Sequence, residues 1–454
     1  MSRGVFFGFS APSILNLYAY AKSAAQVPAF KQHDQGTKRH SCKLCRTVGT
    51  AIKAAMDQWY RQNKILIPWA LLGLEVAVSV GLGLYKINTG SSRDTQVVPS
   101  PLKTLIPKLS DTEAADLPYP PDAYPGARDV NSPYGGLRVY EWGPEDGRKV
   151  VLVHGITTPC VALGAVAQGL VDDGCRVILF DLPGRGYSCT PAPTPHSNRL
   201  YTTIILLALT SSPISWTGNG NRFSLIGYSL GGAIVATFTA YFPSLVSSLV
   251  LLAPGGLIRK ERHTLTNKFL YNTGLLPETM LERIIKSRLK AGDTPTKATP
   301  PKERVTPAAP VMGEVPKEKS TKAPELSRAR PGITVAKVIG WQLDNHPGFV
   351  KSFISSIRYG PVSEEHYHWR RLGERLAAQN ASTEEEYAEQ GLQNGKVLII
   401  GGSKDSLIVK DELIDDATEV LGANNVKFEF LDAGHELPIA KSREIVRYIL
   451  DFWQ

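Results

Sequence analysis

The sequence predicts an α/β protein whose main body is a mainly parallel, twisted sheet with helices on both faces. From about residue 136 onward, short apolar runs that end at glycine alternate with segments of helical apolar spacing. Continuous apolar runs of this length are typical of strands that are buried on both faces, as in a parallel sheet covered by helices. Right-handed connections between such strands then place helices on both faces of the sheet.

Six of these runs are expected to be strands. Ligands of such sheets bind at the carboxyl ends of the strands. The runs are KVVLVHG (149–155), RVILFDLPG (176–184), NRFSLIGYS (221–229), SLVLLAPGG (248–256), KVLIIGGSKD (396–405) and VKFEFLDAGHE (426–436). The run GLRVYEWG (136–143) alternates apolar and polar residues, which predicts an exposed or edge strand. Helical spacing is found in residues 158–174 and 199–212.

The excess of basic residues is confined to the N-terminal tail, residues 1–64. The whole chain has a formal net charge of +9, and the tail alone carries ten basic and two acidic side chains. The rest of the chain is nearly neutral, which disfavours a body that binds nucleic acid. The tail also holds Cys42 and Cys45 in a CxxC pattern, but no second cysteine pair with zinc spacing follows, so we expect no metal.

Residues 65–85 form an apolar run that contains one ionisable side chain, Glu75. A helix of about 20 residues spans the bilayer core, and one central carboxylate costs about 3 kcal/mol on insertion scales. The surrounding Leu, Val and Ala can outweigh that cost, so the run predicts a transmembrane helix. The basic tail then predicts a single-pass membrane protein with a cytosolic N-terminus. A buried helix of a soluble protein and a mitochondrial presequence are the alternatives.

The chain after the predicted membrane helix divides into four further segments. Residues 86–133 are expected to be a Pro-rich linker, because prolines punctuate them and no apolar period persists. The core follows in two parts, 134–256 and 396–454, separated by residues 257–395. Within that separating segment, residues 293–332 hold eight prolines and almost no large apolar side chain. We expect them to be disordered, with a rigid Pro-rich docking segment as the alternative.

The pentapeptide Gly-Tyr-Ser-Leu-Gly, centred on Ser229, joins a predicted strand to a small-residue helical segment. In a G-x-S-x-G motif the serine sits on a sharp strand-to-helix turn, and Gly227 and Gly231 leave room for the neighbouring chain. The N–H of Leu230 would then lie at a helix N-terminus and point toward an anion that forms near the serine oxygen. This pattern predicts a nucleophilic serine.

A nucleophilic serine needs a base, and the base needs an acid that orients it. Asp405 follows one predicted strand and His435 follows the next, so the chain order is Ser229, Asp405, His435. Asp432 and Glu436 are rival acids close to the histidine, but adjacent residues in a tight loop rarely point at the same ring. We therefore predict Ser229 as nucleophile, His435 as base and Asp405 as the orienting acid.

Residues 135–454 resemble the α/β-hydrolase superfamily, in the AB hydrolase branch. The resemblance rests on six motifs: VLVHGITT (151–158), FDLPGRGYS (180–188), LIGYSLGG (225–232), LVLLAPGG (249–256), IIGGSKDSLI (399–408) and DAGHE (432–436). It implies the α/β-hydrolase fold, no cofactor, and a helical cap at 257–395. It also implies that the amide of Ile156, after the His-Gly pair, joins that of Leu230 in the oxyanion hole.

The resemblance implies hydrolysis of an ester or thioester through an acyl-enzyme. A serine at the elbow disfavours epoxide opening and halide removal, which use aspartate there in this family. Acyl transfer, carbon–carbon bond hydrolysis on the same framework and a non-catalytic scaffold remain as alternatives. A membrane segment at 65–85 would keep the site near lipid, so a lipid-like acyl ester is the expected substrate.

Overall fold

The computed structural model describes residues 96–259, 276–291, 326, 332–382 and 391–454. The predicted transmembrane helix at 65–85, the tail with Cys42 and Cys45, and all of the predicted disordered segment 293–332 except Leu326 and Gly332 lie outside these ranges. None of the helices inside them is both long and apolar enough to cross a bilayer.

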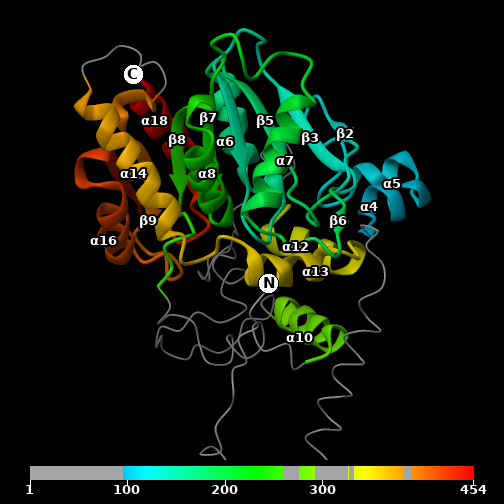
Figure 1. Ribbon diagram of the computed structural model, residues 1–454. Coiled ribbons are helices and arrows are strands. Elements are labelled where there is room, and N and C mark those ends of the chain that lie inside the picture. Colours follow the sequence, from blue (N-terminus) through cyan, green and yellow to red (C-terminus); the bar gives the residue numbers. More distant parts are fainter. Residues whose placement is uncertain (1–95, 260–275, 292–325, 327–331, 383–390) are drawn as a thin grey trace, which may run out of the picture. The chain divides into compact units, whose positions relative to one another are not determined.

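Eight strands form one sheet in the spatial order β10-β9-β8-β7-β4-β5-β3-β2 (Figure 1). The pairs from β10 to β5 are parallel, whereas β3 is antiparallel to both β5 and β2. The strands are β2 (Arg128–Val130), β3 (Leu137–Trp142), β4 (Lys149–Val153), β5 (Arg176–Phe180), β7 (Phe223–Tyr228), β8 (Val246–Leu252), β9 (Val397–Gly402) and β10 (Val426–Leu431). The short strands β1 (Val97–Val98) and β6 (Thr190–Pro191) form a separate antiparallel pair. The predicted mainly parallel sheet is confirmed.

Helices cover both faces of this sheet (Figure 1). One group consists of α6, which packs against α17 and α18. In the other group, α7 packs against α8, α8 packs against α14, and α14 packs against α16. Their bounds are α6 (Gly164–Asp172), α7 (Asn198–Thr210), α8 (Leu230–Tyr241), α14 (His366–Ala381), α16 (Lys410–Leu421), α17 (Leu437–Ala440) and α18 (Ser442–Trp453). Single 3₁₀ turns lie at η2 (Cys160–Leu163), η3 (Pro243–Leu245), η5 (Gln393–Gly395) and η6 (Ala423–Asn425).

Three helices of the expected cap lie beyond the carboxyl ends of the parallel strands: α10 (Glu278–Ala291), α12 (Val335–Asn345) and α13 (Phe349–Tyr359) (Figure 1). Another helix of the segment 257–395, α14, instead packs on α8 and α16 beside the sheet. It presents Trp369, Leu372 and Leu376 as one buried face, at the spacing of one side of a helix. This helix thus packs with helices of the core, and the cap boundary expected at residue 395 stays a prediction.

The segment expected to be a linker, 86–133, contains ordered elements from residue 97 onward. These are β1, α4 (Pro101–Thr104), η1 (Ile106–Lys108), α5 (Asp111–Ala115) and β2. Pro101 stands in the first turn of its helix, where no N–H is needed, and Ser110 forms a capping box with Glu113. Tyr119 is fully buried, and its ring lies 5.2 Å from that of Tyr187. Pro101 and Pro107 thus begin helical elements, so prolines in this segment do not by themselves mark a linker.

Strand β3 lies inside the sheet, although its alternating pattern predicted an edge. All six of its residues are buried, and β2 pairs with Leu137–Val139 on its outer side. The polar residue Glu141 is held in this interior by two cations. One of its oxygens lies 2.7 Å from Arg128 in an ion pair without hydrogen-bond alignment, and the other lies 3.1 Å from Arg176. The alternation thus reflects buried ion pairs rather than exposure to water.

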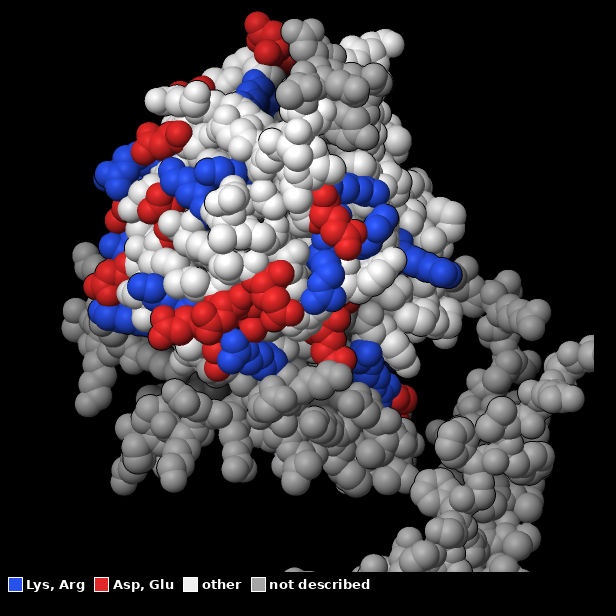
Figure 2. Space-filling model, turned by 60° about the vertical axis from the view of Figure 1, so that its left-hand side comes forward, with Lys and Arg blue, Asp and Glu red and all other residues white. Residues whose placement is uncertain are grey.

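Charged side chains of both signs cover the side of the molecule on which α14 and α16 lie (Figure 2). A run of acidic side chains on this face is bordered by Lys and Arg. Some of these charges are paired, as in Arg259–Asp416 at 2.8 Å and Arg370–Glu419 at 3.3 Å. The expected lack of a nucleic-acid partner stays a prediction.

Replacing Glu141 by alanine should destabilise the fold. The substitution leaves Arg128 and Arg176 without their shared carboxylate, and removing one partner of a buried ion pair costs about 3–5 kcal/mol. We expect a loss of about 3 kcal/mol in the free energy of unfolding, measured by urea denaturation. Glu374→Ala is the control, because its pair with Arg371 is half exposed, and such pairs contribute about 0.5 kcal/mol. Equal losses in both variants would contradict this account of β3.

Candidate active site

The three side chains predicted to act together meet at one edge of the sheet. Ser229 follows β7, Asp405 follows β9 and His435 follows β10, and these strands are parallel members of one sheet. His435 Nε2 lies 2.9 Å from Ser229 Oγ, and His435 Nδ1 lies 2.7 Å from Asp405 Oδ2. The structure therefore brings the three residues into one hydrogen-bonded chain that is almost wholly buried.

The backbone at Ser229 is left-handed, with φ 53° and ψ −118°. A non-glycine residue holds such a conformation only where the surroundings impose it. A Cβ on Gly231 would lie 2.1 Å from the carbonyl oxygen of Val153, and one on Gly227 would lie 2.3 Å from that of Gly231. Both glycines are thus required by space, because α8 approaches the end of β4 at Gly231 and approaches β7 at Gly227.

Backbone groups hold the Asp405 carboxylate independently of its hydrogen bond to the histidine. Its Oδ1 accepts hydrogen bonds from the N–H groups of Leu407 and Ile408, at 2.8 and 2.9 Å, which leaves Oδ2 for His435. On the other side, the Tyr228 hydroxyl donates to the carbonyl oxygen of His435 at 3.0 Å. Backbone N–H groups therefore hold the acid, and a tyrosine hydroxyl holds the backbone of the residue that carries the base.

The two rival acids face elsewhere. Asp432 is largely exposed and forms an ion pair with Lys404 at 2.9 Å. Glu436 accepts a hydrogen bond from the N–H of Gly434 at 3.2 Å. Neither is the carboxylate that contacts the His435 ring, which agrees with the choice of Asp405.

The predicted oxyanion-hole residues flank the serine. Leu230 is the first residue of α8, and Ile156 lies in the loop after β4; both are buried. Within the part of the chain that the structure describes, neither amide donates to a backbone carbonyl of a turn or loop. An oxygen of a ligand could therefore accept from both, although their role in catalysis stays a prediction.

The loops around this site contain three buried polar residues that the sequence reasoning did not assign. His154 directly follows β4, Asp181 directly follows β5, and Arg185 stands between two glycines of the loop after β5. Asp181 accepts hydrogen bonds from the Tyr119 hydroxyl and from the N–H groups of Cys160 and Tyr187. Burial nonetheless raises the pKa of Asp181. A titratable residue directly after an apolar strand was the available signal for His154 and Asp181, whereas Arg185 lies further into its loop and had no such signal.

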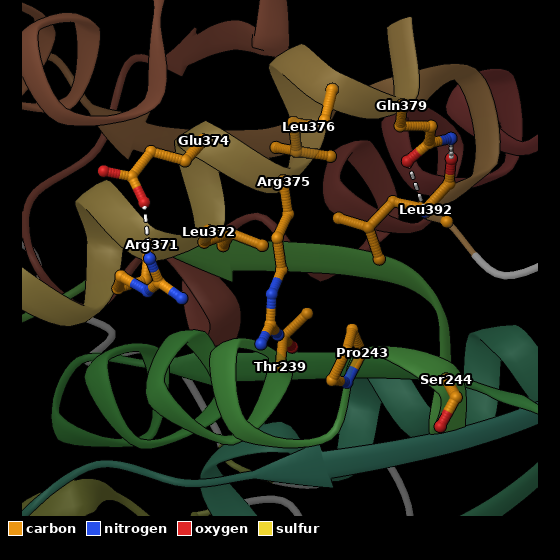
Figure 3. Close-up of a pocket in the computed structure, with 12 residues that line it drawn as sticks. Thr239, Pro243, Ser244, Arg371, Leu372, Glu374, Arg375, Leu376, Gln379 and Leu392 are labelled. Carbon is orange, nitrogen blue, oxygen red and sulfur yellow. Dashed lines mark hydrogen bonds and ion pairs between the residues drawn. The ribbon is translucent and has the colours of Figure 1, made fainter. Parts of the chain in front are cut away.

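A pocket of about 410 Å³ lies between α8 and α14, away from the serine (Figure 3). Arg375 reaches from α14 toward α8 there, and Gln379 is hydrogen-bonded to Leu392 (Figure 3). Thr239, which also lines the pocket, comes ten residues after Ser229. At 1.5 Å per residue, this places it about 15 Å along the helix from the candidate nucleophile. The pocket is thus separate from the candidate site.

No group of three or more His, Cys, Asp or Glu side chains within the described ranges is arranged to hold a metal ion. Cys160, Cys175 and Cys189 are free and buried. Cys42 and Cys45 lie outside these ranges, so their CxxC pattern is not addressed by this finding.

Comparison with known proteins identifies related sequences and folds. The family described as "alpha/beta hydrolase fold" matches residues 149–441. A serine hydrolase-like protein of Danio rerio is 32% identical over 28% of this chain and 38% of its own length. A serine hydrolase-like protein of Dictyostelium discoideum is 30% identical over 27% of this chain and 33% of its own length. The chain thus spans about a third of the length of these curated relatives.

One solved structure, from work on carboxylesterases of Nitrososphaera gargenis, is 16% identical to this chain. It covers 72% of this chain and 97% of its own, with a TM-score of 0.44.

The fold should lose stability in mild acid because three histidines are buried in neutral form. Burial and the nearby Arg185 charge lower the pKa of His154 and His196 to about 3, and burial lowers that of His346 to about 4. In the unfolded chain a histidine titrates near 6.5. Below that pH the unfolded state binds protons that the folded state does not bind. The free energy of unfolding therefore falls as the pH falls. Each histidine contributes up to about 1.4 kcal/mol per pH unit.

Urea denaturation at neutral pH and at successively lower pH values measures this slope. His346→Asn should make the slope shallower, because one of the three proton-binding differences is removed. His366→Asn on α14, whose ring is only partly buried, is the control and should leave the slope unchanged. The same slope in His346→Asn and the unmodified protein would count against the buried-histidine explanation.

Proposed function

Because the chain belongs to the alpha/beta hydrolase fold family, we propose that it is a serine hydrolase that cleaves carboxylic esters or thioesters. The observation that carries the proposal is the hydrogen-bonded chain from Ser229 Oγ through His435 to Asp405. Nucleophile, base and orienting acid in this order are the arrangement used for acyl transfer to serine. The names of the serine hydrolase-like relatives agree with this reaction class.

The first half of the reaction acylates the serine. Asp405 accepts from Nδ1–H of His435, which leaves Nε2 as the atom that can take a proton. As Ser229 Oγ bonds to the substrate carbonyl carbon, its proton passes to Nε2 and the carbonyl oxygen becomes an oxyanion. The amides of Ile156 and Leu230 would hold that oxygen, and one such donor is typically worth about 10²–10³ in rate.

The second half regenerates the enzyme. The tetrahedral intermediate collapses, the bond to the leaving alcohol or thiol breaks, and the proton on His435 is transferred to that group. Water then attacks the acyl-enzyme, gives a proton to His435 and releases the acid, after which the proton returns to Ser229 Oγ. No step of this sequence requires a cofactor.

Acyl transfer and carbon–carbon bond hydrolysis would use the same residues. In acyl transfer an alcohol replaces water at the acyl-enzyme, so product analysis with added alcohols separates it from hydrolysis. A non-catalytic scaffold is disfavoured because Ser229, His435 and both elbow glycines are retained together, and such proteins usually lose one of them.

A fluorophosphonate probe tests the nucleophile directly. The probe should label the unmodified chain at Ser229, and labelling should slow as acid protonates His435, since only the neutral imidazole can accept the serine proton. Ser229→Ala should not be labelled. Ser403→Ala, an exposed serine in the loop that carries the acid, is the matched control and should be labelled normally. Undiminished labelling of Ser229→Ala would overturn the proposed nucleophile.

We further propose a lipid-like acyl ester as substrate, on the basis of the membrane segment predicted at 65–85. If the acyl chain is buried on binding, each methylene contributes about 0.8 kcal/mol. Acetate, octanoate and palmitate esters of one alcohol, presented to the full chain in detergent micelles, should therefore show rising kcat/KM, with Ser229→Ala giving the background. A maximum for acetate would exclude this substrate class while leaving the serine hydrolase proposal intact.

A further inference from the structure

The loop that follows β4 is held by side chains at three successive peptide groups. Each of its consecutive carbonyl oxygens accepts a hydrogen bond from a different buried side chain. The pairs are His154 Nδ1 to Gly155 O at 2.8 Å, Arg185 Nε to Ile156 O at 2.9 Å, and Gln342 Nε2 to Thr157 O at 3.0 Å. All three donor side chains belong to residues that are fully buried.

These hydrogen bonds determine where the amide of Ile156 points. A peptide group is planar, so fixing its carbonyl oxygen also fixes the N–H of the following residue. The carbonyl of Gly155 shares its plane with the N–H of Ile156, the proposed oxyanion donor. The carbonyl of Ile156 belongs to the next plane, which Arg185 holds. Because both planes are held, the backbone of Ile156 has little freedom to turn its N–H away.

Arg185 connects this loop to the cap. Its guanidinium also donates to the hydroxyls of Ser352 and Ser356, the latter at 2.9 Å, and both serines are on α13. It further donates to the carbonyl oxygen of Pro183 at 2.9 Å. A buried cation is stable only when aligned acceptors compensate for lost water. Displacing α13 would remove two of these acceptors and release Arg185 from its position.

Gln342 makes a second connection from the cap, through α12. While its amide nitrogen donates to Thr157, its Oε1 accepts from the N–H of Gly186 at 2.9 Å. A single cap side chain thus links the loop after β4 to the loop that carries Arg185. Both polar atoms of the amide are used, so a residue of similar size without them would leave two buried backbone groups without this partner.

We propose that Gln342 and Arg185 are positioning residues through which the cap helices α12 and α13 act on the loop after β4. They hold this loop, which carries the amide of Ile156, in the geometry that the reaction needs. The proposal rests on the serine hydrolase function above and extends it. The cap then contributes to stabilising the transition state, in addition to covering the site. A loss at either residue should lower kcat for every ester tested, because the oxyanion is common to all of them.

The test compares Gln342→Met and Arg185→Lys with the unmodified full chain. Gln342→Met keeps the side-chain length but cannot donate to Thr157, and Arg185→Lys keeps the charge without the fork of donors. We expect kcat to fall about 10-fold or more with KM changed by less than about twofold, the pattern of an interaction made only in the transition state. Inhibition by a trifluoromethyl ketone, which forms an oxyanion on Ser229, should weaken by a similar factor.

Asn345→Ala is the matched control, because this amide lies on the same helix and donates to the carbonyl oxygen of Trp341 within that helix. Its kcat and its inhibition by the ketone should be unchanged. If Arg185→Lys does not fold, Gln342→Met decides, since a thermal melt shows whether it is folded. A raised KM with unchanged kcat, or no change in either constant, overturns the proposal. The serine hydrolase function itself fails only if Ser229→Ala remains active.

Discussion

The reversal of the chain at Ser229 is the constraint on which the site depends. A left-handed backbone at this position costs about 1–3 kcal/mol, so it must be held by its surroundings. The N–H of Ser229 donates to Leu252 O at 3.0 Å, and its carbonyl accepts from Gly255 N–H at 2.8 Å. Leu252 is the last residue of β8 and Gly255 lies in the loop after it, so the pairing of β7 with β8 brings both partners to Ser229. The sheet therefore stabilises the turn that lifts the hydroxyl above it.

Much of the fold was predictable because local apolar patterns coincide with buried strands. The six runs expected as strands contain β4, β5, β7, β9 and β10 in full and most of β8. The position of β3 was not predictable, since the pattern of Glu141 is the same whether water or two arginines surround the carboxylate. The packing of Tyr119 and of the elements around it could not be predicted either, because it depends on residues far along the chain.

The residues of the site likewise fall into some that the sequence could place and others that it could not. Ser229, Asp405 and His435 stand at strand ends in a recognisable order, so sequence alone could place them together. Arg185 and Gln342 could not be found like this, because the loop after β4 accepts from them through backbone carbonyls, which leave no mark in the sequence. Gln342 is also far from the loop it contacts and lies in a helix whose docking no periodicity predicts. Residues that bind backbone groups are generally visible only in three dimensions.

The outer strand β2 has a consequence for how the domain is delimited. A fragment that starts at residue 134 would contain every sequence motif of the fold but would lack β2 and Tyr119. Its β3 would then present unpaired backbone groups along its outer side, which is a template for aggregation. A fragment of this body that stays in solution should therefore begin before Tyr119, upstream of the first recognisable motif.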